Sequence, residues 1–195
     1  MSNPMQTRIR YLYEETLACV KCAYVTTPPN DRYAHSVTML MLGTIAQESR
    51  FYYRRQGGFS WDSPRGAWGL GQMEQAGIGR SLNVLRKNQQ LADRMGKWLF
   101  GQDDDDMEII QRMVSELSVQ DLCRMVSSHD RLALAFMRLY YIACPGAVPD
   151  TLQQQAAYYK QFWNTYAGKA TTGQYIDNFQ RLVEPALKDY ANGLE

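Results

Sequence analysis

Residues 37–48 of the chain read VTMLMLGTIAQE. One face of this segment follows the three- and four-residue spacing of a buried helix, through Val37, Leu40, Met41, Thr44 and Ile45. The next position on the same face is Glu48, directly before a glycine-rich stretch. The pattern therefore predicts an apolar helix whose last turn carries a carboxyl group toward the protein interior.

The pKa of such a glutamate depends on opposing effects. Burial and the negative end of the helix dipole both raise it. Nearby cations lower it, and Arg50, Arg54 and Arg55 follow in the sequence. If burial dominates, Glu48 becomes a proton donor near neutral pH. The ordinary alternative is a solvated or salt-bridged glutamate at a helix end, with no chemical role.

Composition limits the classes of protein to consider. A length of 195 residues predicts one domain, and 45% apolar residues indicate a globular chain. Because the chain has 21 basic and 20 acidic residues, its charge balance argues against a nucleic-acid binder that relies on a strong basic field, and no nucleic-acid partner is expected. The longest apolar stretch, residues 37–46, is half the roughly 20 residues that span a bilayer, so no membrane insertion is expected. The N-terminus lacks the apolar core of a signal peptide, which predicts synthesis in the cytoplasm without an export signal.

Helical patterns extend along most of the chain, and the predicted fold class is mainly α. Predicted helices precede Pro28, follow Gly79 to beyond residue 100, and cover residues 132–142 and 151–166. A last helix reaches about residue 192, with Pro185 as a predicted kink or break.

Residues 57–79 hold seven of the 14 glycines and predict a loop that turns tightly. A short β-hairpin within residues 51–72 is compatible with this segment. Rings with polar edges suit sugar faces, although we expect at least half of the rings near the loop to be ordinary packing. These rings belong to Phe51, Tyr52, Tyr53, Phe59, Trp61 and Trp68.

The cysteines and the acidic run both favour structural explanations. Cys19 and Cys22 form a CxxC inside a helical pattern, without a second CxxC or a histidine at ligand spacing, so we expect reduced thiols in or beside the core. Residues 103–106 are four aspartates before an apolar segment, which fits the negative first turn of a helix. We expect no metal and no cofactor.

Three segments in order carry a family resemblance: QESRF at 47–51, GAWGLGQM at 66–73 and YIACPG at 141–146. Together they resemble the lysozyme-like lytic transglycosylases, relatives of goose-type lysozyme, over residues 40–146. The fold implied is a lysozyme-like helical domain with a glycine-rich cleft loop. RRQGG at 54–58, QME at 72–74 and YYKQFWNT at 158–165 are similar to a phage-encoded, virion-associated branch of that superfamily.

The resemblance implies roles for individual residues. Glu48 corresponds to the catalytic acid/base, and Tyr141 to the tyrosine that faces it. Substrate contacts are expected from Ser49, which supports the acetamido group, and from Gln72, Met73, Glu74 and Tyr140. Tyr140 is also the alternative to Tyr141, because the third segment departs from the family at Ile142 and Cys144; Gly71 departs in the second.

The reaction implied is cleavage of the MurNAc–GlcNAc bond of peptidoglycan. Glu48 would protonate the glycosidic oxygen and then accept the proton of the 6-hydroxyl, which gives a 1,6-anhydro product. Hydrolysis is the alternative, and it needs a second carboxylate as base. Glu74 is the preferred candidate for that base, with Asp62 the other.

The expected organisation is a catalytic-type domain at 1–150 and a C-terminal helical extension at 151–195 that packs on it or docks a partner. The resemblance implies a protein carried in a virion, with peptidoglycan strands, other virion or tail proteins and further copies of itself as partners. The alternative is a structural tail component that keeps the scaffold, cuts little or nothing, and exposes apolar patches outside the cleft.

Overall fold

Helices dominate the structure, a computed structural model that describes residues 3–24, 30–52, 65–101, 112–165 and 168–192. Within these ranges the β structure is limited to an isolated antiparallel bridge between Trp68 and Met73. The expectation of a mainly α chain is confirmed. Most of the segment considered for a hairpin, residues 53–64, lies outside the described residues, as do the aspartates at 103–106.

Two capped helices start the chain. α1 (Pro4–Cys22) begins after Asn3, whose side chain accepts a hydrogen bond from the Met5 amide, and α2 (Asp31–Glu48) begins after Asn30, which accepts from the Tyr33 amide. α2 is buried over most of its length and ends at the predicted glutamate.

The next helices are α3 (Gln75–Arg86), α4 (Gln89–Phe100), α6 (Val119–Ser128) and α7 (Asp130–Ile142). α3 begins four residues before Gly79, earlier than predicted, so Gly77 and Gly79 lie inside it. Each glycine costs a helix roughly 1 kcal/mol. Burial of Ile78, Leu82 and Leu85 contributes roughly 1.5–3 kcal/mol each, which outweighs that cost.

The C-terminal part consists of α8 (Leu152–Phe162), α9 (Thr172–Asn178), a π-helical segment (Phe179–Val183) and α10 (Glu184–Asn192). The predicted kink at Pro185 takes the form of this wider segment, in which the Glu184 amide bonds to the Phe179 carbonyl. A π turn just before a proline accommodates a ring that lacks an N–H donor.

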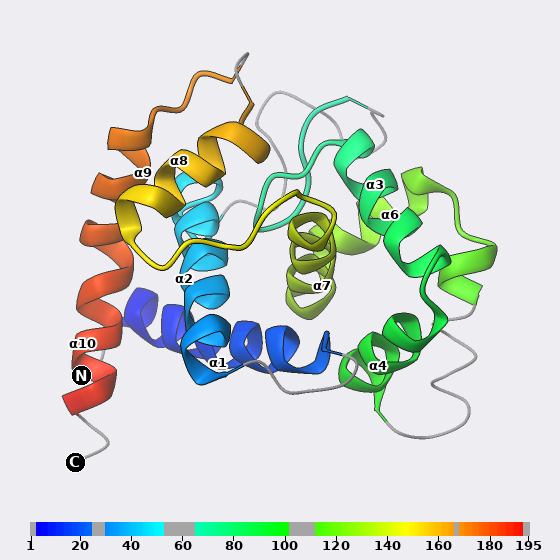
Figure 1. Cartoon of the computed structure of the whole chain (residues 1–195), viewed down its shortest axis with the longest axis horizontal. Helices are drawn as coiled ribbons and strands as arrows, with labels where there is room; N and C mark the ends of the chain where they lie inside the picture. Colours follow the sequence, from blue (N-terminus) through cyan, green and yellow to red (C-terminus); the bar gives the residue numbers. More distant parts are fainter. Residues whose placement is uncertain (1–2, 25–29, 53–64, 102–111, 166–167, 193–195) are drawn as a thin grey trace.

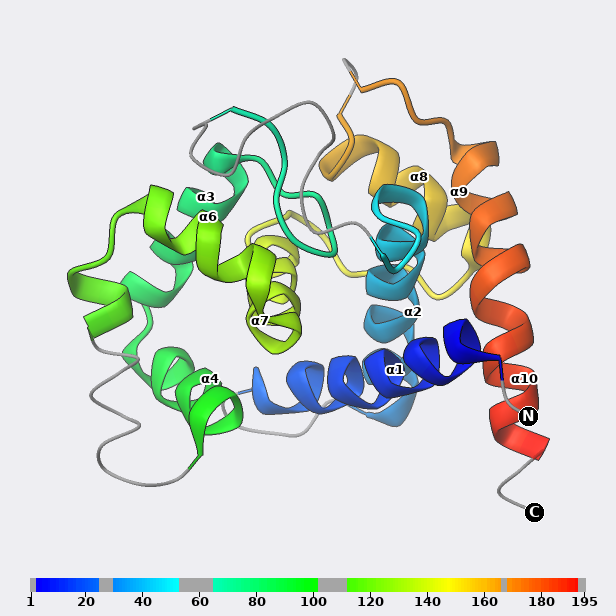
Figure 2. The same ribbon diagram turned by 180° about the vertical axis from the view of Figure 1, so that it is seen from behind.

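The helices form two groups on either side of α7 (Figures 1 and 2). α3, α4 and α6 lie on one side, and α2, α8, α9 and α10 lie on the other. α1 runs across one end and contacts α2, α4, α7 and α10. The helices after residue 150 pack on α1 and α2. The division into a domain at 1–150 and an extension at 151–195 stays a prediction.

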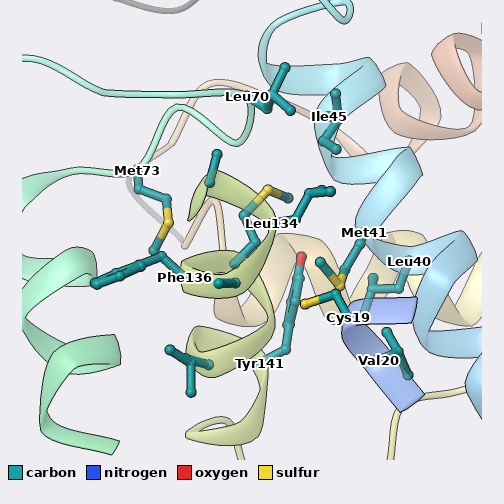
Figure 3. Packing of buried hydrophobic residues seen from close by; sticks show 14 of the residues in the cluster. Cys19, Val20, Leu40, Met41, Ile45, Leu70, Met73, Leu134, Phe136 and Tyr141 are labelled. Atoms are coloured by element: carbon teal, nitrogen blue, oxygen red, sulfur yellow. The ribbon is translucent and has the colours of Figure 1, made fainter. Parts of the chain in front are cut away.

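The core lies where α1, α2 and α7 meet (Figure 3). Leu40, Met41 and Ile45 of α2 are fully buried there, as the spacing predicted. Gly43 leaves room on the same helix for Tyr175, whose hydroxyl donates to the Leu40 carbonyl over 3.0 Å.

Gly43→Ala should destabilise the protein by about 2 kcal/mol, because a methyl group there collides with the buried Tyr175 ring. Gly79→Ala is the matched control on α3, where the added methyl meets Val119 at an ordinary 3.7 Å and should stabilise the helix by roughly 0.5–1 kcal/mol. Urea unfolding of the two variants measures both effects. Equal stabilities would contradict the packing described for Tyr175.

Candidate active site

A cavity of about 580 Å³ opens between the two groups of helices. The end of α2, the segment at 67–74, the first turns of α3, Tyr140 of α7 and the segment after α8 all reach it. The lining residues are Glu48, Ala67, Gln72, Met73, Glu74, Ala76, Gly77, Arg80, Tyr140, Trp163, Asn164, Thr165 and Gly168. The predicted residues Glu48, Gln72, Met73, Glu74 and Tyr140 therefore share one cavity.

Glu48 is half-buried at the wall of this cavity. The pKa of Glu48 is raised to about 7, chiefly by burial and also by the negative charge of Glu74. A hydrogen bond from Tyr159 acts in the opposite direction. Arg50 is exposed and does not contribute to this shift, while Arg54 and Arg55 lie outside the described residues.

Tyr159 of α8 donates its hydroxyl proton to Glu48 Oε1 over 2.5 Å. Burial and the neighbouring Glu48 charge raise the pKa of Tyr159, so the hydroxyl keeps its proton and remains a donor. Its ring lies 4.9 Å from that of Tyr175, measured between centroids. The Tyr175 ring therefore packs against the residue that bonds to the glutamate.

Tyrosines from three helices meet one face of α2. Tyr175 bonds to the Leu40 carbonyl, Tyr141 pairs with Thr44 Oγ1 over 2.6 Å, and Tyr159 bonds to Glu48. The contacted positions are spaced by four residues, so they lie in one row along the helix. This row fixes the last turn of α2 and thereby the position of the Glu48 carboxyl group.

Two sequence-based assignments need correction. Tyr141 does not line the cavity, because it is 2% exposed in the core (Figure 3) and its hydroxyl is paired with Thr44. The tyrosine that contacts Glu48 is Tyr159. Ser49 is also outside the cavity lining, because it is fully buried and its hydroxyl donates back to the Ile45 carbonyl.

The segment before α3 forms one wall. Trp68 and Met73 exchange two main-chain hydrogen bonds, and Gly69 between them has a φ of 71°, which favours glycine. The Trp163 Nε1 donates to the Gly71 carbonyl over 3.2 Å, and its ring lies 4.8 Å from that of Tyr140. The C-terminal part of the chain thus holds this wall in place.

Left-handed backbone conformations occur beside the cavity. Gln72 and Thr165 line it with φ angles of 49° and 58°, and Arg50 and Phe51 have φ angles of 50° and 66° just after Glu48. Such conformations are uncommon outside glycine and concentrate at functional sites. Their position supports a functional role for this cavity.

The predicted aromatic cluster divides into separate environments. Phe51 and Trp68 are fully buried, whereas Tyr52 is exposed. Tyr53, Phe59, Trp61 and the alternative base Asp62 lie outside the described residues. None of the three described rings lines the cavity, where the aromatic residues are Tyr140 and Trp163.

Sequence reasoning assigned no role to Tyr159, Trp163 or Asn164. All three belong to the YYKQFWNT segment at 158–165, which was noted only as a looser resemblance. A signal was therefore present in the sequence, but nothing in its spacing showed which ring would reach Glu48.

Comparisons with protein-family models, with curated proteins and with solved structures gave no match. None of the helices in the described ranges is both long enough and apolar enough to cross a membrane. All four cysteines are free thiols, with Cys22 partly accessible and the others buried.

The raised pKa of Glu48 predicts how the stability of the protein depends on pH. Unfolding returns the pKa from about 7 to an ordinary glutamate value near 4.3, and the difference corresponds to roughly 4 kcal/mol. The folded state therefore holds the proton more tightly, and wild-type stability falls as the pH rises from about 4 to 8. Urea unfolding should show that Glu48→Gln avoids most of this loss. An unchanged stability difference between the two proteins at pH 4.5 and pH 8 would refute the shift.

Tyr159→Phe should raise the pKa of Glu48 further, by about one pH unit, because the carboxylate loses a charge-assisted hydrogen bond. Carbon-13 NMR titration of the glutamate carboxyl groups measures this directly. Tyr158→Phe is the matched control, since the hydroxyl of Tyr158 lies 3.5 Å from the Pro145 carbonyl and has no contact with Glu48. Equal titration of both variants would show that the Tyr159 bond does not influence Glu48.

Proposed function

We propose that the protein cleaves peptidoglycan at the MurNAc–GlcNAc bond as a lytic transglycosylase or muramidase, with Glu48 as its acid. The observation that supports this most is a glutamate with a pKa of about 7, half-buried at the wall of an open cavity. An acid with a pKa near the working pH is the group that protonates a leaving oxygen most effectively. The resemblance of residues 47–51 and 66–73 to the lysozyme-like lytic transglycosylases supports the same assignment.

The proposed reaction starts with neutral Glu48. Its proton moves to the glycosidic oxygen as the C1–O bond breaks, and the 2-acetamido group of the MurNAc residue supports C1. The resulting Glu48 carboxylate then takes the proton of the MurNAc 6-hydroxyl, whose oxygen closes on C1 to form the 1,6-anhydro product. Tyr159 donates a hydrogen bond to the carboxylate formed between the two steps.

Glu74 offers the alternative route, hydrolysis. It lines the same cavity as Glu48, and its charge raises the Glu48 pKa, so the two carboxyl groups act on one site. As an exposed group just before α3, Glu74 is able to activate a water molecule at C1. The hydrolytic reaction would then depend on both carboxyl groups, whereas the transglycosylase reaction depends on Glu48.

Substrate contacts in this proposal come from the other cavity residues. Gln72, Met73 and Tyr140 keep the roles that the resemblance implied, and Trp163 and Asn164 join them from the C-terminal part. A virion-borne protein that opens the cell wall during infection is the setting we propose. The scaffold alternative draws no support from the described surface, where Tyr11 and Tyr52 are the exposed large apolar residues.

The test is incubation of the purified protein with peptidoglycan and mass spectrometry of the muropeptides released. Glu48→Gln should lower the rate by about 100-fold or more, because it removes the proton donor and keeps the shape. The wild-type kcat/KM should fall as the pH rises through about 7, where Glu48 loses its proton.

Glu74→Gln separates the two routes. Anhydro-ended products at a nearly unchanged rate indicate a transglycosylase, whereas reducing-ended products that disappear in this variant indicate hydrolysis. A folded wild-type protein that releases no muropeptide would overturn the proposal and favour the scaffold alternative.

A further inference from the structure

The cavity lining has a negative charge at the start of α3, on Glu74, and a positive charge further along the helix, on Arg80. Glu74 is the N-cap of α3, Gly77 and Arg80 lie within the helix, and all three line the cavity. At 1.5 Å per residue, Arg80 lies about 9 Å along the helix axis from Glu74. The charged residues of the described cavity lining are therefore two carboxyl groups, Glu48 and Glu74, and one guanidinium group displaced from Glu74 along α3.

Arg80 is fixed in place by neutral groups. One guanidinium nitrogen donates to the Ala143 carbonyl, just after α7, and the group lies over the Tyr140 ring with its carbon 5.1 Å from the ring centroid. A guanidinium group has five N–H donors in a planar fork. Most of those donors therefore stay available to a ligand, while the two contacts hold the group against the cavity wall.

Arg80 forms no ion pair with a carboxylate in the part of the chain that the structure describes. Other arginines do: Arg8 with Asp130, Arg32 with Asp150, Arg124 with Asp121 and Arg131 with Glu15. An unpaired guanidinium on the wall of a cavity is a recognition element for an anion, and its geometry matches a carboxylate.

We propose that Arg80 forms a subsite for a carboxylate carried by the bound glycan strand. This inference rests on the proposed function, because peptidoglycan carries such groups on the MurNAc lactyl substituent or, when that is peptide-linked, on the peptide stem. Glu48 acts on the glycosidic bond, and Arg80 binds the anion elsewhere along the same cavity. The site then discriminates against neutral glycans such as chitin fragments and fixes the direction in which the strand lies.

The test removes the charge of Arg80 and that of the strand carboxylates, first separately and then together. Wild-type protein and Arg80→Gln are compared on peptidoglycan strands with native carboxylates and on strands whose carboxylates have been converted to amides. We expect Arg80→Gln to lower kcat/KM about tenfold on native strands, and amidation to lower the wild-type value by a similar factor. Combining both changes should cause no further loss, because each removes the same interaction.

Arg86→Gln is the matched control. Arg86 lies on the same helix, is exposed and donates to a main-chain carbonyl, that of Val114, but it does not line the cavity. It should behave as wild type on both substrates. If Arg80→Gln matches Arg86→Gln, or if its loss and that of amidation multiply, the carboxylate subsite is wrong.

Binding to the Glu48→Gln protein separates this inference from the proposed function. Titration calorimetry with native and amidated muropeptides should show tighter binding of the native form, and Arg80→Gln should abolish the difference. If this preference is found but the wild-type protein releases no muropeptide, the proposed function is overturned and the subsite is kept, whereas equal binding of both forms would overturn the subsite.

The source of the carboxylate follows from strands stripped of peptide by an amidase. The amidase hydrolyses the lactyl–peptide amide bond, so the stem carboxylates are lost and a free lactyl carboxylate is exposed. An Arg80 dependence that persists assigns the lactyl group, and one that vanishes assigns the peptide stem. Either result supports the subsite.

Discussion

The structure depends on placing a carboxyl group at the end of a buried helix while keeping it in reach of a cavity. α2 meets this constraint through a row of tyrosine contacts at Leu40, Thr44 and Glu48. Gly43 makes the row possible, because a larger residue would displace the Tyr175 ring. The helix end is thus held by side chains from α7, α8 and α9, and the burial that comes with this position is the main cause of the raised pKa of Glu48.

The C-terminal part of the chain is therefore integral to the candidate site. α8 supplies the hydroxyl that contacts Glu48, and Trp163 holds the Gly71 carbonyl on the opposite wall. Asn164, Thr165 and Gly168 complete that side of the cavity. A segment that was expected to pack on the domain or dock a partner thus has a direct part in shaping the place where a ligand would bind.

The sequence predicts what depends on spacing along one helix and fails where helices cross. The 3,4-residue pattern of α2 located Glu48 at the end of a buried face, because that pattern is a property of the helix itself. Choosing among Tyr140, Tyr141 and Tyr159 required the crossing of α7 and α8 over α2, which local sequence does not encode. Ser49 was misassigned for a related reason: its hydroxyl satisfies the helix end instead of the cavity.

The hydrogen bond from Tyr159 suits the two steps that the proposed reaction requires of Glu48. Burial alone favours the neutral acid and would oppose release of its proton. Any ligand that excludes water from the cavity would strengthen this effect. The Tyr159 hydroxyl stabilises the carboxylate and so limits the rise. A group that first donates and then accepts a proton needs both forms within reach near the working pH, and the balance between burial and Tyr159 supplies that condition.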